Sequence, residues 1–287
     1  MTYNDFWRPL TQVYDAAEAK AVARLVMELR FGLSLADVLS GAVEQMNDAA
    51  IRELEDSQRR LLQGEPVQYV LGEAEFCGRR FVVNPAVLIP RPETAQLCQM
   101  ITQRNRSNQN TQNTPTAQSI LDVGTGSGCI AVTLALDMED VRVTAWDISE
   151  AALDVARTNA ARLGAEVALR RQDALAPPAD DEVWDVIVSN PPYICLQERP
   201  SMAHNVKDFE PDTALFVPDD DPLRFYRAIG SYALRALKPG GELFFELNAR
   251  YAHETAGMLE GLGFSDVTLH QDQFGKDRFI SVCRSRR

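Results

Sequence analysis

The sequence lacks the residue clusters that hold structural metal ions or disulfide frameworks. Its three histidines are far apart, and its five cysteines are odd in number, widely spaced and without a Cys-x-x-Cys pair. A small disulfide scaffold or a zinc site needs such pairs. We therefore expect reduced thiols and no bound metal.

Long apolar runs and secretion signals are also missing. No stretch approaches the roughly 18 uninterrupted apolar residues of a membrane-spanning helix. Residues 1–7 contain no basic segment followed by an apolar one. We expect a cytoplasmic protein that does not enter membranes. Its 287 residues, 45% hydrophobic and 24% charged, are typical of a globular enzyme of about two domains.

Positive charge is scarce. The chain has 29 lysines and arginines against 41 aspartates and glutamates, which gives a formal net charge of −12. Tight binding to duplex nucleic acid depends on cationic side chains that neutralise phosphates. One compact basic cluster occurs, at residues 284–287, and a short basic tail is usually solvated. Direct binding of nucleic acid is therefore not expected.

The first quarter of the chain has helical periodicity. Val22, Leu25, Val26 and Leu29 recur at the spacing of one helix face, and a similar stripe follows after residue 50. The pattern predicts a small helical bundle over residues 1–73. Because such a bundle can lengthen an interface beside an active site, we expect it to recognise the substrate.

A β-hairpin is predicted to connect this bundle to a second domain. Residues 75–76 and 80–83 read as strands on either side of a turn at 77–79. The linking segment is placed at 74–90 and the second domain at 91–287.

Two segments of the chain are predicted to be irregular. Residues 89–94 carry two prolines and are expected to form a rigid, extended loop. Residues 104–113 contain no apolar side chain, so the polar stretch 102–119 is expected to be a mobile surface loop.

From Ser119 onward, predicted strands and helices alternate. This order is typical of an α/β fold with a mostly parallel sheet covered on both faces. A turn near Gly275 predicts that the last two strands are antiparallel. The seven expected strands are 120–123, 141–146, 167–169, 183–189, 242–247, 267–270 and 279–283.

A glycine-rich turn follows the first of these strands and precedes a helix. Its residues are Gly124, Thr125, Gly126, Ser127 and Gly128. Such a turn lets the backbone approach a ligand closely, and the helix N-terminus favours negative charge. The dinucleotide fingerprint places its third glycine at the sixth position, where this chain has a cysteine. The spacing therefore favours S-adenosyl-L-methionine over NAD.

Acidic residues follow the next two strands. Asp147 could accept hydrogen bonds from both ribose hydroxyls of the cofactor, and Asp173 could accept one from its adenine amino group. Asp173 alone is more typical of a cap or a solvated loop. The ordered set of strand-end contacts favours a cofactor site.

The fourth strand ends in Asn190, Pro191, Pro192 and Tyr193. In a doubly wound sheet, ligands bind outside the carboxyl ends of the strands. The Asn190 side-chain oxygen and the Pro191 carbonyl can each accept a hydrogen bond, and Tyr193 offers a flat ring for stacking. The run therefore predicts a socket for a planar amino group, with Asn190 also bordering the cofactor. Turn formation alone is the simpler alternative for such a tetrapeptide.

Several motifs together resemble the release factor glutamine methyltransferases. They are Gly64-Glu65-Pro66-Val67-Gln68-Tyr69, Leu88-Ile89-Pro90-Arg91-Pro92-Glu93-Thr94, the glycine turn with Leu121-Asp122-Val123, Ser189 to Ile194, Phe209-Glu210-Pro211 and Gly275-Lys276-Asp277-Arg278. The resemblance covers about residues 55–285. It implies a class I (Rossmann-like) methyltransferase fold: a mixed seven-stranded sheet with a small N-terminal helical bundle and a linking β-hairpin.

The resemblance also implies a reaction. A methyl group would pass from S-adenosylmethionine to the side-chain amide nitrogen (N5) of the glutamine in the Gly-Gly-Gln motif of class 1 peptide chain release factors. The glycine turn and Asp147 would hold the cofactor, and residues 190–193 the glutamine. We expect a monomer. Departures at Ala95, Ala174 and residues 217–221 and 246–248 concern details of the pocket.

Other functions fit parts of the pattern. A DNA amino-methyltransferase acting on adenine N6 would present the same planar amino group to the same socket. The net charge argues against it. A catalytically silent nucleotide-binding module would leave the Asn190 socket idle.

Overall fold

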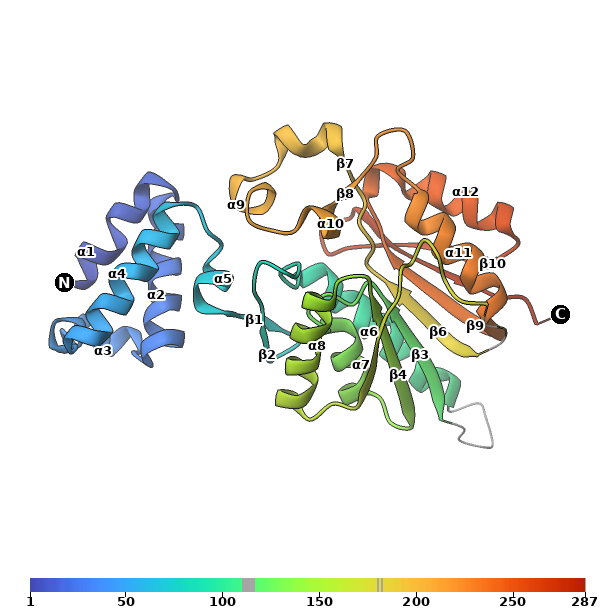
Figure 1. The fold of residues 1–287 in the computed structure, drawn as a ribbon, viewed down its shortest axis with the longest axis horizontal. Helices are drawn as coiled ribbons and strands as arrows, with labels where there is room; N and C mark the ends of the chain where they lie inside the picture. The colour runs from blue at the N-terminus through green and yellow to red at the C-terminus, as the bar shows by residue number, and fades with distance from the viewer. Residues whose placement is uncertain (110–116, 180, 182, 287) are drawn as a thin grey trace. The chain divides into compact units, whose positions relative to one another are not determined.

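The computed structural model describes residues 1–109, 117–179, 181 and 183–286 (Figure 1). The chain divides into two compact units, Met1–Ala74 with Met202–Phe209 and Glu75–Ser201 with Glu210–Arg287. Within the described ranges, no helix is long and apolar enough to cross a membrane. The domain boundaries at residues 73 and 90 stay predictions.

The first unit is helical, as the periodicity predicts. Side chains with no exposed surface form its centre, among them Phe6, Leu10, Val26, Met27, Leu54 and Leu61. Burial of such side chains contributes roughly 1.5–3 kcal/mol each relative to exposure. The helices are α1 (Tyr3–Trp7), α2 (Ala16–Phe31), α3 (Leu35–Leu39), α4 (Asp48–Leu62), α5 (Val67–Leu71) and α9 (His204–Lys207), with 3-10 turns η1 (Pro9–Gln12) and η2 (Val43–Gln45).

The predicted hairpin consists of β1 (Glu73–Phe76) and β2 (Arg79–Val82). Asn159, buried on α8 (Glu150–Leu163), holds β2 in place. Its Oδ1 accepts a hydrogen bond from the Val82 amide at 2.6 Å, and its Nδ2 donates to the Ser127 carbonyl at 2.8 Å. Burial of this amide costs little free energy because its donors and acceptor are paired. The two hydrogen bonds link the hairpin to the glycine turn.

Helix α6 (Pro92–Gln109) corrects two of the predictions. Residues 92–94 are its first turn and not an extended loop, because a proline at the first helical position loses no intrahelical hydrogen bond. Residues 104–109 continue the helix and are not a loop. The buried side chains Leu97, Cys98 and Ile101 anchor it, and propagation of a packed helix is easy. Residues 110–116 of the predicted loop lie outside the described residues.

The second unit contains the predicted seven-stranded mixed sheet, in the order β10-β11-β9-β6-β3-β4-β5. The five strands β9, β6, β3, β4 and β5 are parallel. Strand β11 is antiparallel to β10, as predicted, and also to β9. The strands are β3 (Gln118–Val123), β4 (Val141–Asp147), β5 (Val167–Arg171), β6 (Trp184–Ser189), β9 (Leu237–Glu246), β10 (Ser265–Gln271) and β11 (Asp277–Cys283).

Helices cover both faces of this sheet (Figure 1). Helices α6, α7 (Cys129–Asp137) and α8 lie on one face, and α11 (Arg224–Ala236) and α12 (Ala252–Leu262) on the other. Successive strand residues alternate between the two cores: Ile120 and Val186 belong to one, Leu121 and Ile187 to the other. Apolar residues on both sides of each strand are what a doubly covered sheet requires.

Several elements of the second unit were not predicted. Helix α12 has a readable signal, because Ala252, Thr255 and Leu259 recur at helical spacing and are all buried. The remainder are too short for a periodic pattern. They are β7 (Ile194–Cys195), η3 (Leu196–Ser201), α10 (Asp212–Leu215), β8 (Phe216–Val217) and η4 (Ala249–Tyr251), with β7 pairing in parallel with β8.

The strand order reverses at the centre of the sheet. After β3 the chain adds β4 and β5 on one side, and β6 then returns to the other side of β3. Ligands of such sheets bind outside the carboxyl ends of the strands at this switch point. The glycine turn and Asn190 follow the two strands that flank it.

Candidate active site

A cavity of about 360 Å³ lies at the carboxyl ends of the parallel strands. Residues 124–127 line it after β3, Asp147 after β4, 172–175 after β5 and 190–192 after β6. The structure therefore brings together the predicted glycine turn, both predicted aspartates and most of the predicted Asn-Pro-Pro-Tyr run.

The glycine turn leaves open space beside its backbone. Gly124, Gly126 and Gly128 have φ angles of +77°, +53° and +80°. Residues with a Cβ rarely adopt such positive φ angles. A Cβ added at Gly124 or Gly126 would meet no heavy atom within 4 Å, whereas one at Gly128 would lie 3.1 Å from the Ala156 Cβ. The first two glycines thus keep room for a ligand, and the third allows close packing on α8.

The Asp147 carboxylate is tied to the glycine turn. Its Oδ2 accepts a hydrogen bond from the Gly126 amide at 2.9 Å, and its Oδ1 accepts one from the Ser149 amide at 2.9 Å. Burial raises the pKa of Asp147, and these hydrogen bonds oppose the rise. Each carboxylate oxygen keeps a further lone pair, so Asp147 can hold the turn and still accept ligand hydroxyls.

Asp173 lines the cavity beside Ala174 and Leu175. Its Oδ1 accepts a hydrogen bond from the Leu175 amide at 2.8 Å, which is the local turn bond typical of aspartate. The side chain therefore has a structural partner as well as a position at the cavity. Its contact with the adenine stays a prediction.

Asp122 is a site-forming residue for which the sequence analysis proposed no role. It is fully buried in β3, and its Oδ2 accepts hydrogen bonds from Thr125 Oγ1 at 2.6 Å and from the Ala131 amide at 3.2 Å. Its Oδ1 has no hydrogen-bond partner among the described residues. Burial raises the pKa of Asp122 to about 7. A single acidic residue inside an apolar strand was the available signal, since such burial is costly.

Asn190 lies beside the glycine turn because β6 and β3 are cross-linked at their ends. Ser189 Oγ donates a hydrogen bond to the Val123 carbonyl at 2.6 Å. The Asn190 side-chain nitrogen, Nδ2, donates to Thr94 Oγ1 at 3.4 Å, and no described residue donates to its Oδ1. The acceptor that the predicted socket needs is therefore free.

Tyr193 lies away from the cavity that residues 190–192 line. It is not among the described residues that line the cavity, and its ring packs against the core beneath α11. Its hydroxyl donates to Glu246 Oε1 at 3.2 Å, and its backbone carbonyl accepts from Asn248 Nδ2 at 3.1 Å. The expected stacking of this ring on a substrate amide stays a prediction, and in this structure the ring is engaged elsewhere.

A partly buried ion pair holds the segment that precedes α6 against the cavity. Glu210, which is 4% exposed, accepts a hydrogen bond from the Ile89 amide at 3.1 Å and pairs with the Arg91 guanidinium at 2.5 Å. Charge-assisted bonds of this kind are roughly twice as strong as neutral ones. The contact explains why two motifs far apart in the sequence, around Arg91 and Glu210, contribute to one site.

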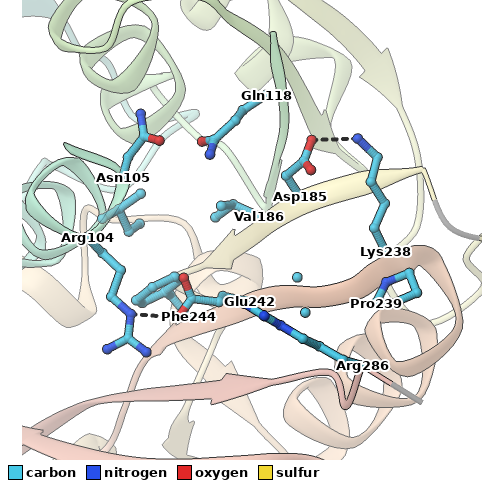
Figure 2. A pocket seen from close by; sticks show the side chains of 13 residues that line it. Arg104, Asn105, Gln118, Asp185, Val186, Lys238, Pro239, Glu242, Phe244 and Arg286 are labelled. Atoms are coloured by element: carbon cyan, nitrogen blue, oxygen red, sulfur yellow. Dashed lines mark hydrogen bonds and ion pairs between the residues drawn. The ribbon is translucent and has the colours of Figure 1, made fainter. Parts of the chain in front are cut away.

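A second cavity, of about 290 Å³, lies at the amino ends of β3, β6 and β9 (Figure 2). Four of its charged side chains form two ion pairs: Lys238 Nζ lies 2.7 Å from Asp185 Oδ2, and Arg104 Nε lies 2.7 Å from Glu242 Oε1. None of the residues predicted as a functional site lines it.

The first cavity fits S-adenosylmethionine. Open space beside Gly124 and Gly126 admits a ligand to the backbone, and Asp147 supplies acceptors at the neighbouring strand end. Behind the turn, the buried Asp122 Oδ1 has no hydrogen-bond partner among the described residues. The acceptors that line the cavity suit an adenosyl ligand, which carries hydroxyl and amino groups.

Two family models match the sequence: "PrmC N-terminal domain" over residues 10–72 and "Methyltransferase small domain" over residues 108–206. The solved structure of a methyltransferase from Pyrococcus furiosus aligns with a TM-score of 0.51 at 18% identity, covering 80% of this chain and 99% of that chain. This likeness concerns the fold, which is that of class I methyltransferases. The chain is a methyltransferase, and its cofactor is S-adenosylmethionine.

Curated relatives match nearly the whole chain. A release factor glutamine methyltransferase from Bacteroides thetaiotaomicron is 45% identical over 276 residues, 96% of each chain. Another from Flavobacterium psychrophilum is 36% identical over 277 residues, again 96% of each chain. The chain therefore belongs to the family of release factor glutamine methyltransferases.

Proposed function

We propose that the chain transfers a methyl group from S-adenosylmethionine to the side-chain amide nitrogen, N5, of the glutamine in the Gly-Gly-Gln motif of class 1 peptide chain release factors. The relatives named above support this substrate. The observation that carries the chemistry is the free Asn190 Oδ1, which lies on the wall of the same cavity as the glycine turn.

The substrate nitrogen must first regain a usable lone pair. In a planar amide this lone pair is delocalised into the carbonyl, so the nitrogen is a poor nucleophile. Asn190 Oδ1 and the Pro191 carbonyl can each accept one N–H of the glutamine amide. Held in this way, the hydrogens stay in place while the nitrogen pyramidalises and its lone pair turns toward the cofactor side of the cavity.

The same two oxygens stabilise the transition state. Bound S-adenosylmethionine supplies an electrophilic methyl group. As the amide nitrogen becomes positively charged, fixed acceptors at Asn190 and Pro191 lower its energy without reorganising, and the effect is larger in a site shielded from water. Alignment of the two reactants supplies much of the remaining rate enhancement. The nitrogen then loses a proton to solvent or to a nearby carboxylate, so no strong base is needed beforehand.

We infer further that the helical residues 1–73 contact the release factor away from its glutamine, and that the protein acts as a cytoplasmic monomer. The separate helical core of this unit supports a recognition role, because none of its described residues lines the cavity. The five cysteines, all free thiols, are compatible with a reducing compartment.

Transfer of labelled methyl groups tests the substrate directly. Three acceptors are compared at equal concentration: a class 1 release factor, the same factor with the motif glutamine replaced by alanine, and duplex DNA rich in adenine. We expect label on the first alone. Label on the alanine variant or on DNA would contradict the proposal. The DNA outcome is disfavoured by the net charge of −12 and by the family assignment.

A further inference from the structure

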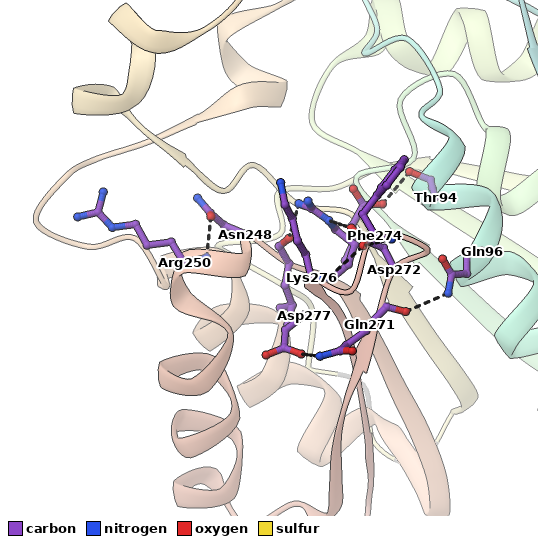
Figure 3. A network of polar contacts seen from close by, with 12 residues as sticks. Thr94, Gln96, Asn248, Arg250, Gln271, Asp272, Phe274, Lys276 and Asp277 are labelled. Atoms are coloured by element: carbon purple, nitrogen blue, oxygen red, sulfur yellow. Dashed lines mark hydrogen bonds and ion pairs between the residues drawn. The ribbon is translucent and has the colours of Figure 1, made fainter.

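A chain of hydrogen bonds runs from the Asn190 side chain to a buried carboxylate on β9. Asn190 Nδ2 donates to Thr94 Oγ1 at 3.4 Å, and Thr94 Oγ1 donates to Glu246 Oε2 at 2.7 Å. Thr94 and Glu246 are each 2% exposed. Thr94 lies in the first turn of α6, facing the polar network around the β10–β11 turn (Figure 3).

The direction of each hydrogen bond follows from the ionised carboxylate. A carboxylate only accepts, so the single hydroxyl hydrogen of Thr94 must point to Glu246. The oxygen of Thr94 is then left with lone pairs alone, which select the donor end of the Asn190 amide. Asn190 therefore turns its NH2 toward Thr94 and leaves Oδ1 on the opposite side of its planar amide, free of donors from the described residues.

The second oxygen of Glu246 restrains the other end of the Asn-Pro-Pro-Tyr run. The Tyr193 hydroxyl donates to Glu246 Oε1 at 3.2 Å, and Asn248 Nδ2, just beyond β9, donates to the Tyr193 carbonyl at 3.1 Å. Glu246 thus holds Asn190 through Thr94 and Tyr193 directly. One carboxylate fixes both ends of the segment that carries the substrate acceptors.

We propose that Glu246 is a positioning residue for methyl transfer: acting through Thr94, it sets the orientation of the Asn190 amide so that Oδ1, and not the NH2 group, meets the substrate nitrogen. This inference rests on the proposed function. A reversed Asn190 amide would present two donors to the NH2 group of the glutamine, which offers no acceptor in its planar form. The same socket would then repel the group that it is meant to bind.

Glu246 performs this role only when ionised. Six groups interact with its carboxyl by hydrogen bonds or through their charge: Glu93 and Thr94 on α6, Cys129 on α7, Tyr193, Tyr226 on α11 and Arg278 on β11. The Arg278 guanidinium is itself bonded to Asp272 Oδ2 and to the Leu247 carbonyl, each at 3.3 Å. Burial raises the pKa of Glu246, and Thr94, Tyr193 and Arg278 oppose the rise.

A pH dependence follows with a defined sign. Below the raised pKa of Glu246 the carboxyl is protonated and can donate its own hydrogen to Thr94, so the Thr94 hydroxyl can reverse and donate to Asn190. Turnover should therefore fall as the pH drops through this value. Glu246→Gln carries a permanent amide donor, and we expect it to lower kcat at every pH and to remove this acid limb of the profile.

The decisive experiment is a double-substitution cycle on the full-length enzyme with a release factor as methyl acceptor. Thr94→Val removes the hydroxyl with little change in volume, and Asn190→Ala removes the amide that it orients. We expect Thr94→Val alone to lower kcat by roughly tenfold, and to have little further effect once Asn190 is alanine, because contacting residues that act as a unit are not additive. Thr94→Ser, which keeps the hydroxyl, should restore most of the rate.

Matched measurements separate positioning from unfolding. Glu242→Gln changes another buried glutamate on the same strand, outside the active-site cavity, and should leave kcat and its pH profile unchanged. Calorimetry should give the wild-type dissociation constant for S-adenosylmethionine in the Thr94 and Glu246 variants.

Three outcomes would count against the inference. Additive effects of Thr94→Val and Asn190→Ala would overturn the coupling, and an unchanged acid limb in Glu246→Gln would overturn the role of the carboxylate. Both leave the proposed function intact, because the wild type is active in these assays. A wild type that does not methylate the release factor would overturn the proposed function and, with it, this inference.

Discussion

The two ends of the parallel sheet both carry a cavity and acidic residues within the strands, but the partners of these strand carboxylates differ. At the amino end, Arg104 pairs with Glu242 and Lys238 with Asp185. At the carboxyl end, Asp122 and Glu246 are held by hydroxyl and amide donors. Burial raises the pKa of Glu242 as it does those of Asp122 and Glu246, but the Arg104 guanidinium, paired with Glu242, opposes the rise. Asp122 and Glu246 form no ion pair with any described residue. Such uncompensated groups are typical of functional sites.

The largest contrast is expected between two asparagines. Asn190→Ala should lower kcat by roughly 100-fold or more with cofactor affinity retained, by analogy with the loss of one preorganised polar contact. Asn105, which is buried at the amino-end cavity, provides the matched control, and Asn105→Ala should leave kcat unchanged. Steady-state kinetics and calorimetry measure both quantities. Equal losses in the two variants would remove the distinction between the ends.

A smaller contrast concerns cofactor affinity. Asp147→Ala removes the acceptors for the Gly126 and Ser149 amides and the expected contact to the ribose. The dissociation constant for S-adenosylmethionine should therefore rise by roughly 10-fold to 100-fold. Asp185→Ala, at the amino end, should leave it unaltered. Calorimetry on the purified enzyme decides the matter. An unchanged constant in Asp147→Ala would reject its role at the cofactor site.

The free energy of unfolding should also depend on pH because Asp122 titrates. Its pKa is raised by burial to about 7, so the folded state binds the proton more tightly than the unfolded state does. The resulting stabilisation is fully present at pH values below the unfolded pKa and is lost as the pH rises through the folded value. Between these limits, the free energy of unfolding should fall by at most about 1.4 kcal/mol per pH unit.

Denaturant titrations of the ligand-free protein test this slope. Asp122→Asn cannot titrate, so its free energy of unfolding should lose this decline across the same pH range. A wild type that gains stability over the interval would show that Asp122 is not the dominant group.

The smallest effect is expected at the amino-end ion pair. Lys238 and Asp185 are 40% and 28% exposed, and pairs of this kind contribute at most about 1 kcal/mol. Lys238→Met should therefore change the unfolding free energy by less than about 1 kcal/mol and leave turnover unaltered. A large loss of turnover in this variant would imply that the two ends of the sheet are coupled.

Much of this fold follows from local pattern. Strand and helix alternation after Ser119 predicts the seven-stranded sheet. Ser149 and Gly164, residue types that favour helix caps, bound α8. The start of α6 could not be placed in the same way, because Pro92 is compatible with both a loop and a first helical turn. Polar residues after Arg104 carry no periodic signal, so the extent of that helix depends on packing already established upstream.

The residues of the functional site also fall into those that local sequence predicts and those that only packing brings together. Residues 124–128, Asp147 and Asn190 follow strand ends, and the parallel topology alone brings them together. Thr94 and Glu246 lie far apart in the sequence and meet only when α6 packs beside β9. A polar residue within a buried strand, as at Asp122 and Glu246, was the one local sign that these positions have a special role. The hydrogen-bond partners of these two residues could be identified only from the structure.

Identification of the modified atom tests the central claim most directly. A release factor is incubated with the enzyme and S-adenosylmethionine, digested, and analysed by fragmentation mass spectrometry. We expect the mass of one added methyl group on the glutamine of the Gly-Gly-Gln peptide, with the group on N5, and none when Asn190→Ala is used over the same short time. An unmodified glutamine with the wild-type enzyme, or a methyl group on another residue, would contradict it.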